Sequence, residues 1–385
     1  MKVFLYIIDA GGMIMSKKYS DELLNQIQQK QKEVCINGVH VLMKPIPDCD
    51  EEGMMDPRLY HDNKKMATMM RFMPKSLMKM DASPKSIERL RGMFNGVKSE
   101  PIASNQIEVL PQTIKGLDDN DIPLQIYLPI ERRENMPVLY YIHGGGFFAG
   151  HMGVVDQLVK MIVEKFNIVA VSIDYRLAPE NPYPKGHEDC YEGLKWVYQH
   201  IEDYGGDIHH IFVAGDSAGG NLTQYCTTRD KEDESHMVKG QLLLYPTVNM
   251  AGIDDEDSHW SLERYQIHPK HRKVIEASLS MMGGDNGMSS MLGDILGTED
   301  ITNHYLTPYL MDLRDLPPTF LTVGEHDFLY IECMAYAKKL VEAGVETKTV
   351  VYKGMGHAYG DNIGVYPQSE DCAIEMGKFI IEHSK

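Results

Sequence analysis

The sequence predicts an α/β protein with a mostly parallel eight-stranded sheet, helices on both faces and a mainly helical cap. From about Ser104 onward, short apolar runs alternate with helical patterns, which is typical of a parallel sheet covered by helices. Several runs are apolar throughout, as expected for strands buried on both faces. The expected strands are Gln106–Val109, Leu124–Tyr127, Val138–Ile142, Ile168–Ile173, Ile211–Ala214, Leu242–Tyr245, Thr319–Val323 and Thr347–Tyr352. The expected helices lie near Val155–Lys165, His187–His200, Ala218–Thr228, Tyr330–Ala343 and Ser369–Glu382.

The alternation is interrupted at two places, which divide the chain into a core and a cap. Residues 1–103 read as a helical and irregular extension that contributes to the cap, and residues 247–302 as an acidic, Gly- and Met-containing cap insertion. Residues 104–246 and 303–385 form the expected catalytic core. Six methionines between Met66 and Met80 either line an adaptable apolar pocket or belong to ordinary core packing.

Charge and composition restrict the expected partners. A formal net charge of -18 disfavours nucleic acid and anionic membrane surfaces, so the expected partner is a neutral small molecule, with no nucleic acid and no stable membrane association. A homodimer is left open. The six cysteines form no CxxC pair and are expected to be reduced thiols. The apolar run Val3–Ile8 is too short for a signal core or a membrane span, which predicts a cytoplasmic location.

A GxSxG motif marks the expected nucleophile. Gly215-Asp216-Ser217-Ala218-Gly219 follows an apolar strand and precedes a helical segment. A sharp strand-to-helix turn exposes the serine hydroxyl, and the flanking glycines permit the strained backbone. Ser217 is therefore the candidate nucleophile.

A glycine run upstream supplies the expected oxyanion hole. Gly144, Gly145 and Gly146 follow the strand Val138–Ile142, and their backbone N–H groups can approach a developing negative charge without a Cβ in the way. The N–H of Ala218 is the expected partner donor. The alternative is a tight loop without a chemical role. His143, at the start of this run, is expected to be structural.

A serine nucleophile needs a base and an acid that orients the base. His357 follows the last expected strand in a glycine-flanked loop, and Asp327 follows the strand Thr319–Val323. Glu325 is a competing acid two residues earlier. The order serine, acid, histidine is the one used by hydrolases built on a strand-turn-helix serine.

The motifs HGGGFFAG (143–150), DYRLAPENPYP (174–184) and GDSAGGN (215–221) resemble those of the hormone-sensitive lipase family of α/β-hydrolases. The resemblance extends from about Val138 to the C-terminus. It implies the α/β-hydrolase fold and, through a GExDxL pattern, assigns the acid to Asp327 rather than Glu325. A G-M-x-H pattern assigns the base to His357.

The resemblance implies a serine carboxylesterase for short, acetyl-like acyl esters that requires no cofactor and no metal ion. Deacetylation of sugars or xylan fragments is an alternative within the same chemistry. A hydrolase-fold ligand receptor is the alternative from another class, because the similar plant gibberellin receptors keep the pocket but lose the catalytic histidine. Ser217 and His357 are both present here, which favours the enzyme.

Overall fold

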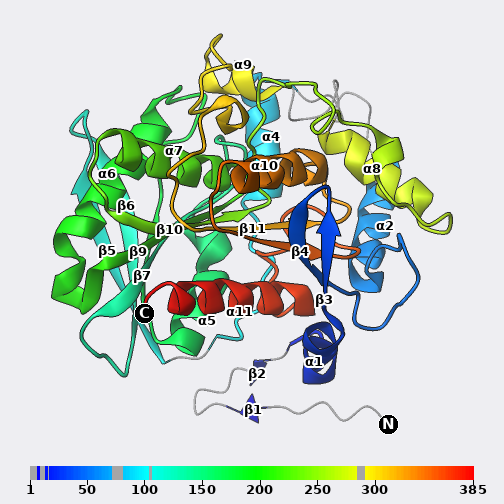
Figure 1. The fold of residues 1–385 in the computed structure, drawn as a ribbon, viewed down its shortest axis with the longest axis horizontal. Coiled ribbons are helices and arrows are strands. Elements are labelled where there is room, and N and C mark those ends of the chain that lie inside the picture. Colours follow the sequence, from blue (N-terminus) through cyan, green and yellow to red (C-terminus); the bar gives the residue numbers. More distant parts are fainter. Residues whose placement is uncertain (1–6, 9–13, 16, 72–80, 104–105, 284–290) are drawn as a thin grey trace.

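The centre of the molecule is a ten-stranded sheet with the order β3-β4-β12-β11-β10-β9-β7-β8-β6-β5. This computed structural model describes residues 7–8, 14–15, 17–71, 81–103, 106–283 and 291–385 (Figure 1). The strands of the sheet are β3 Lys32–Ile36, β4 Val39–Lys44, β5 Ile107–Lys115, β6 Asp121–Pro129, β7 Met136–Ile142, β8 Val169–Ile173, β9 Gly206–Asp216, β10 Val238–Leu244, β11 Thr319–Gly324 and β12 Thr347–Tyr352. A separate pair joins β1 Ile7–Ile8 to β2 Ile14–Met15.

Most of the sheet is parallel, and its central strands are buried on both faces. From β4 through β8 in the sheet order, each neighbouring pair is parallel, whereas β3, β6 and β5 pair antiparallel with their neighbours. Every residue of β7, β8 and β11 is buried, which explains why their sequences are mostly apolar, with Ser172, Thr319 and Thr322 as buried polar exceptions. The α/β-hydrolase architecture expected from the sequence is therefore confirmed.

Helices cover both faces of the sheet. The helices α5 and α11 pack together on one face, and α7 and α10 lie on the other (Figure 1). The helix bounds are α1 Asp21–Lys30, α2 Pro57–Arg71, α4 Pro84–Phe94, α5 Met152–Phe166, α6 Lys185–His200, α7 Ala218–Glu232, α8 Arg272–Met282, α9 Leu292–Leu296, α10 Tyr330–Glu342 and α11 Pro367–Glu382. Short 3-10 turns span Ile201–Tyr204, Leu262–Arg264 and Pro308–Leu310.

Two expectations were wrong for residues 32–44. The sheet has ten strands rather than eight, and this part of the N-terminal extension is a β-hairpin rather than helical and irregular. All eight expected strands lie in the sheet, and the hairpin β3–β4 adds two more by pairing β4 parallel to β12. The turn is Asn37-Gly38, with positive φ values of 49° and 85°. An Asn-Gly pair between two apolar runs is a strong hairpin signal. The strands on either side are only five and six residues long, so their alternation is a weak pattern.

Part of the remaining extension lies near the insertion, whereas α1 packs against α11. Helix α2 packs against α8, and a small apolar cluster that includes Met55, Ile275 and Ile331 fills the space there. Met66 and Met69 are exposed, and the methionines at 73, 78 and 80 lie outside the described residues, so the pocket expected from them stays a prediction. We retain as a proposal a core of 104–246 and 303–385 with a cap from 247–302 and part of 1–103.

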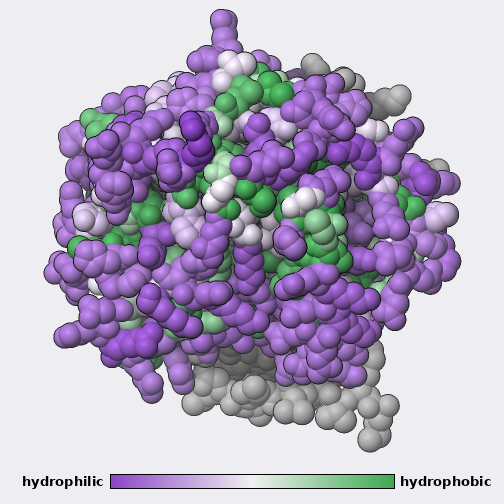
Figure 2. Space-filling view, viewed as in Figure 1, coloured by the Kyte–Doolittle hydropathy of each residue, from purple (hydrophilic) through white to green (hydrophobic). Residues whose placement is uncertain are grey.

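The surface in the view of Figure 2 is mostly hydrophilic, with hydrophobic residues near its middle and in smaller groups toward the top and the sides. The large exposed apolar side chains are scattered along the chain rather than consecutive. In the stretches that the structure describes, no helix is long and apolar enough to cross a bilayer.

Candidate active site

Ser217 lies on the turn between β9 and α7 and has a strained backbone, with φ 53° and ψ -117°. A non-glycine residue in this region costs about 1–3 kcal/mol and persists only where its surroundings hold it. The Ser217 N–H donates to the Leu244 carbonyl at 2.9 Å. A Cβ on Gly215 would lie 2.2 Å from the Gly219 oxygen, and one on Gly219 would lie 2.1 Å from the Ile142 oxygen. The two glycines are thus required by close approach of the backbone.

The three side chains expected to form the triad meet at the carboxyl edge of the sheet. His357 Nε2 lies 2.9 Å from Ser217 Oγ, and His357 Nδ1 lies 2.9 and 3.0 Å from the two carboxylate oxygens of Asp327. Ser217, Asp327 and His357 follow β9, β11 and β12, which run parallel in one sheet and therefore end at the same edge. Asp327 is fully buried and also accepts the Leu329 N–H.

Glu325, the competing acid, makes a different contact. Its carboxylate accepts the N–H of Gly354 at 2.9 Å, and burial raises its pKa to about 7. The contact joins the loop after β11 to the loop that leads to His357. Glu325 thus helps to hold that loop, while Asp327 is the carboxylate within hydrogen-bond distance of His357.

In the glycine loop, residues 143–150, one of the amides expected to donate to the oxyanion already has an acceptor. The N–H of Gly144 donates to Asp216 Oδ1 at 2.9 Å, so this donor is occupied. Burial raises the pKa of Asp216 to about 6, and its carboxylate also accepts the Tyr141 hydroxyl at 3.2 Å. The N–H groups of Gly145, Gly146 and Ala218 have no hydrogen-bond acceptor among the described residues. These three amides therefore remain the candidate oxyanion donors.

His143 is built into the loop rather than into the triad. Its Nδ1 lies 2.8 Å from the Gly144 oxygen, its ring stacks on Tyr175 at 4.4 Å, and burial lowers its pKa. The Tyr175 hydroxyl donates to the His143 carbonyl at 3.1 Å. These contacts agree with a structural role.

The structure brings aromatic side chains to the triad that sequence reasoning did not select. The rings of Phe328 and Tyr245 lie 4.7 and 5.1 Å from the His357 ring. Trp260 Nε1 donates to the Phe328 carbonyl at 3.1 Å, and the Tyr265 hydroxyl donates to the Asp327 carbonyl at 3.0 Å. Nothing in the sequence marks Trp260 or Tyr265, because they come from the insertion and reach the loop only through folding.

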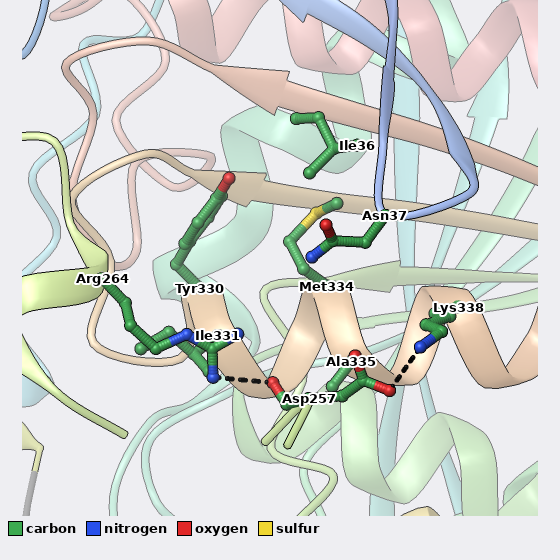
Figure 3. A pocket seen from close by; sticks show the side chains of 9 residues that line it. All are labelled: Ile36, Asn37, Asp257, Arg264, Tyr330, Ile331, Met334, Ala335 and Lys338. Carbon is green, nitrogen blue, oxygen red and sulfur yellow. Dashed lines mark hydrogen bonds and ion pairs between the residues drawn. The ribbon is translucent and has the colours of Figure 1, made fainter. Parts of the chain in front are cut away.

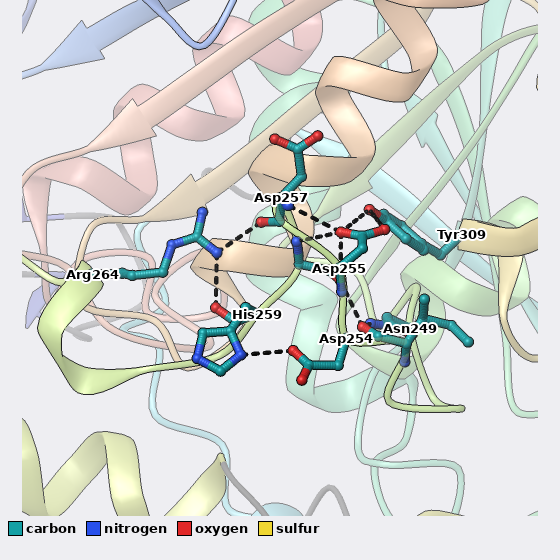
Figure 4. Close-up of polar contacts among 9 residues, drawn as sticks. Asn249, Asp254, Asp255, Asp257, His259, Arg264 and Tyr309 are labelled. Carbon is teal, nitrogen blue, oxygen red and sulfur yellow. Dashed lines mark hydrogen bonds and ion pairs between the residues drawn. The ribbon is translucent and has the colours of Figure 1, made fainter.

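Polar contacts fix the segment that carries Trp260 and Tyr265 (Figure 4). Asp255 accepts the Tyr309 hydroxyl at 2.9 Å, and Arg264 Nη1 donates to the carbonyls of Asp257 and His259 at 2.9 and 2.8 Å. The insertion is therefore attached both to the 3-10 turn Pro308–Leu310 ahead of β11 and to the loop that carries Asp327.

A cavity of about 260 Å³ lies along helix α10, on the side of Tyr330, Met334 and Lys338 (Figure 3). The tip of the β3–β4 hairpin contributes Ile36 and Asn37 to its wall. Lys338 is paired there with Asp257 at 2.6 Å. None of the triad residues lines this cavity, so the candidate active site rests on the triad geometry and not on the cavity. Within the described ranges, no group of three or more His, Cys, Asp or Glu side chains is arranged to hold a metal ion.

Comparisons with known proteins agree with this fold. A family model described as alpha/beta hydrolase fold matches residues 139–361. Carboxylesterase NlhH of Mycobacterium tuberculosis is 32% identical over 292 residues, covering 74% of this chain and 86% of the relative. An arylesterase of Saccharolobus solfataricus is 27% identical and covers 78% of this chain and 92% of its own length.

Solved structures of esterases are similar in three dimensions as well. A hyperthermophilic esterase from Pyrobaculum calidifontis has a TM-score of 0.67 at 25% identity, covering 85% of this chain and 98% of its own. A thermostable carboxylesterase cloned from a metagenomic library has a TM-score of 0.65 at 26% identity, covering 79% and 98%.

The fold and the serine on its strand-to-helix turn define a serine hydrolase. The chain belongs to the alpha/beta hydrolase fold family, and the resemblance to the hormone-sensitive lipase family is confirmed. The enzyme is a serine carboxylesterase rather than a hydrolase-fold receptor.

Proposed function

We propose that the protein hydrolyses short-chain carboxylic esters through an acyl-enzyme, with Ser217 as nucleophile, His357 as base and Asp327 as the orienting acid. One observation carries the proposal: the continuous chain of contacts from Ser217 Oγ to His357 Nε2 at 2.9 Å and from His357 Nδ1 to Asp327 at 2.9 Å. Nucleophile, base and orienting acid within hydrogen-bond reach are the elements of this mechanism.

In the first half of the reaction, His357 takes the proton of Ser217 as Oγ attacks the ester carbonyl. The carbonyl oxygen then gains negative charge, which the N–H groups of Gly145, Gly146 and Ala218 stabilise. The Ala218 amide lies in the first turn of α7, where the helix also favours negative charge. His357 then gives its proton to the leaving alcohol.

In the second half, water replaces the alcohol. His357 removes a proton from the water, which attacks the acyl carbonyl, and the same amides hold the oxyanion again. Ser217 recovers its proton from His357 as the carboxylic acid leaves. Buried Asp327 stabilises the imidazolium in both halves, because a carboxylate next to Nδ1 favours the protonated ring.

The preference for short acyl chains is supported by the family resemblance. Deacetylation of sugars uses the same first step with an acetyl group, so it remains an alternative within the proposal. We also propose a cytoplasmic enzyme, on the grounds that all six cysteines are free thiols. Both a monomer and a homodimer are compatible with this chemistry.

The deciding experiment compares wild type and Ser217→Ala with p-nitrophenyl acetate. We expect the variant to lose at least about 10³-fold in kcat, because the hydroxyl that forms the acyl-enzyme is gone. Ser384→Ala, near the C-terminus, is the matched control and is expected to retain full activity. Equal rates for wild type and Ser217→Ala would contradict the proposal.

A substrate panel then tests the finer assignment. p-Nitrophenyl esters from two to sixteen carbons should give the highest kcat/KM at short chains. Acetylated xylo-oligosaccharides test the sugar alternative directly. A maximum at long chains would contradict the short-chain preference without affecting the triad assignment.

A further inference from the structure

Helix α4 of the N-terminal extension lies against the glycine loop 143–150. Ile87 and Leu90 are buried in the same apolar cluster as Phe148, and the rings of Phe94 and Phe148 meet edge to face at 5.7 Å. Arg91 and Asn95 are four residues apart and therefore lie on one face of the helix end. The helix lies outside residues 139–361, the part matched by the family model.

Arg91 binds two loops at once. Its Nε donates to the Phe148 carbonyl at 2.6 Å, and its Nη2 donates to the Ala178 carbonyl at 2.8 Å. Nη1 donates to Glu180 at 2.8 Å. The planar guanidinium presents these donors in fixed directions, which the single ammonium of lysine does not reproduce. The side chain is 25% exposed, so the two carbonyl contacts are largely shielded from water.

Asn95 holds the other end of the glycine loop. Its Oδ1 accepts the N–H of Gly150 at 2.8 Å. Its backbone carbonyl lies 3.2 Å from His151 Nε2. Because His151 Nδ1 accepts the Gly153 N–H, Nε2 carries the ring proton and donates to Asn95. Arg91 and Asn95 thus contact the loop at Phe148 and at Gly150.

The contacts at Phe148 and Gly150 affect the oxyanion donors because hydrogen bonds within the loop connect its two ends. The Ala149 N–H donates to the Gly145 carbonyl at 2.9 Å, and Gly145 adopts φ 116°. A shift of Phe148 or Gly150 is therefore transmitted to Gly145 and Gly146, whose amides have no acceptor among the described residues. Amides that stabilise an oxyanion must be placed to within a fraction of an ångström.

We propose that Arg91 and Asn95 are positioning residues that hold the glycine loop so that its amides face the reacting carbonyl. The inference rests on the proposed function, since it assigns a role within the same site. The extension then takes part in the reaction through loop geometry, and neither residue touches the substrate.

The experiment measures kcat and KM for p-nitrophenyl acetate in Arg91→Ala, Arg91→Lys, Asn95→Leu and Asn95→Asp. Lys85→Ala, an exposed position on the same helix, is the control. We expect Arg91→Ala and Asn95→Leu to lower kcat about 10- to 100-fold with KM changed less than about twofold, because the lost interaction acts on the transition state. Asn95→Asp keeps the acceptor and should stay near wild type, and Arg91→Lys should fall between. Asn95 has ordinary right-handed backbone angles, so these substitutions do not strain it.

Two further measurements separate positioning from folding. Guanidinium ion, added far below denaturing concentrations, should restore part of the kcat of Arg91→Ala and leave Lys85→Ala unchanged. The rate at which a phosphonate ester modifies the serine should fall by the same factor as kcat, since that reaction also develops charge on an oxygen in the oxyanion hole. A thermal midpoint for each variant identifies loss by unfolding.

Unchanged kcat in both Arg91→Ala and Asn95→Leu would overturn the inference. It would also be overturned if the loss of kcat followed the unfolded fraction of each variant and disappeared when the assay is cooled. If Arg91→Ala does not fold, the Asn95→Leu and Asn95→Asp pair decides. Ser217→Ala is measured alongside: full activity there means that the proposed function fails, whereas an inactive Ser217→Ala with active Arg91 and Asn95 variants removes only the positioning role.

Discussion

Glu332 is a partly buried carboxyl group whose pKa leads to a prediction in numbers. It lies on α10, and its Oε1 alone accepts the N–H groups of Val248 and Asn249, at 2.8 and 3.2 Å. Burial raises the pKa of Glu332 from 4.5 to about 7, against the lowering effect of those two N–H groups, and nearby Asp327 adds to the rise. We predict that Glu332→Gln stabilises the protein at pH 8 but not at pH 5.

The sign follows from the number of protons bound in each state. Between pH 4.5 and about 7, native Glu332 keeps a proton that the unfolded chain releases, so the free energy of unfolding falls as the pH rises through this window. A shift of about 2.5 pH units corresponds to roughly 3 kcal/mol at pH 8, as an upper limit. Glutamine keeps the accepting oxygen and carries no charge, so it avoids this cost.

Urea unfolding of wild type and Glu332→Gln at pH 5 and pH 8 measures the difference. We expect the variant to be more stable at pH 8 by about 1–3 kcal/mol and to lie within about 0.5 kcal/mol of wild type at pH 5. Glu342→Gln, on the same helix but exposed, should show no such pH dependence. Equal differences at the two pH values, or a variant less stable at pH 8, would refute the reasoning.

Two further substitutions test the packing behind the site. Lys44→Met should lower the free energy of unfolding by about 3–5 kcal/mol in urea, because Lys44 is fully buried against Asp371 at 2.9 Å and its removal leaves a buried carboxylate unpaired; a loss under 1 kcal/mol would contradict this. Gly219→Ala should abolish esterase activity and cost at least about 1–3 kcal/mol, since the new Cβ would lie 2.1 Å from the Ile142 oxygen. Gly92→Ala is the control, because no atom lies within 4 Å of the new Cβ, and it should stabilise the protein by about 0.5–1 kcal/mol. A wild-type rate in Gly219→Ala would contradict the prediction, since the turn at Ser217 would then tolerate the methyl group.

The central parallel strands could be predicted because strands buried on both faces are mostly apolar, as Met136–Ile142 shows. The hairpin at residues 32–44 could not be separated from loop by periodicity alone. Its strands are short, and one of them, Lys32–Ile36, is an edge strand with mostly exposed or half-exposed residues. The Asn37-Gly38 turn was the available signal.

Position in a glycine-containing motif directly after an apolar strand selected Ser217, His357 and an acid in the loop after Thr319–Val323, because the carboxyl ends of parallel strands meet at one edge. The resemblance to the hormone-sensitive lipase family then selected Asp327 rather than Glu325. Sequence reasoning also selected Gly144 as an oxyanion donor. The structure corrects that selection, since the Gly144 N–H is occupied by Asp216. A motif identifies which amides are near the serine, but not which of them already have an acceptor.

By itself, therefore, the sequence determined the fold class, the nucleophile and the base, because local patterns of apolar runs and glycine motifs predict them, and its resemblance to a known family added the acid. The tertiary structure alone decided what supports them: Arg91 and Asn95 at the glycine loop, Tyr265 and Trp260 at the Asp327 loop, and Glu332 beneath the segment at 248–249. These contacts join residues far apart in the chain through single hydrogen bonds. Such bonds depend on directions and distances set by packing, and they leave no pattern in the neighbouring sequence.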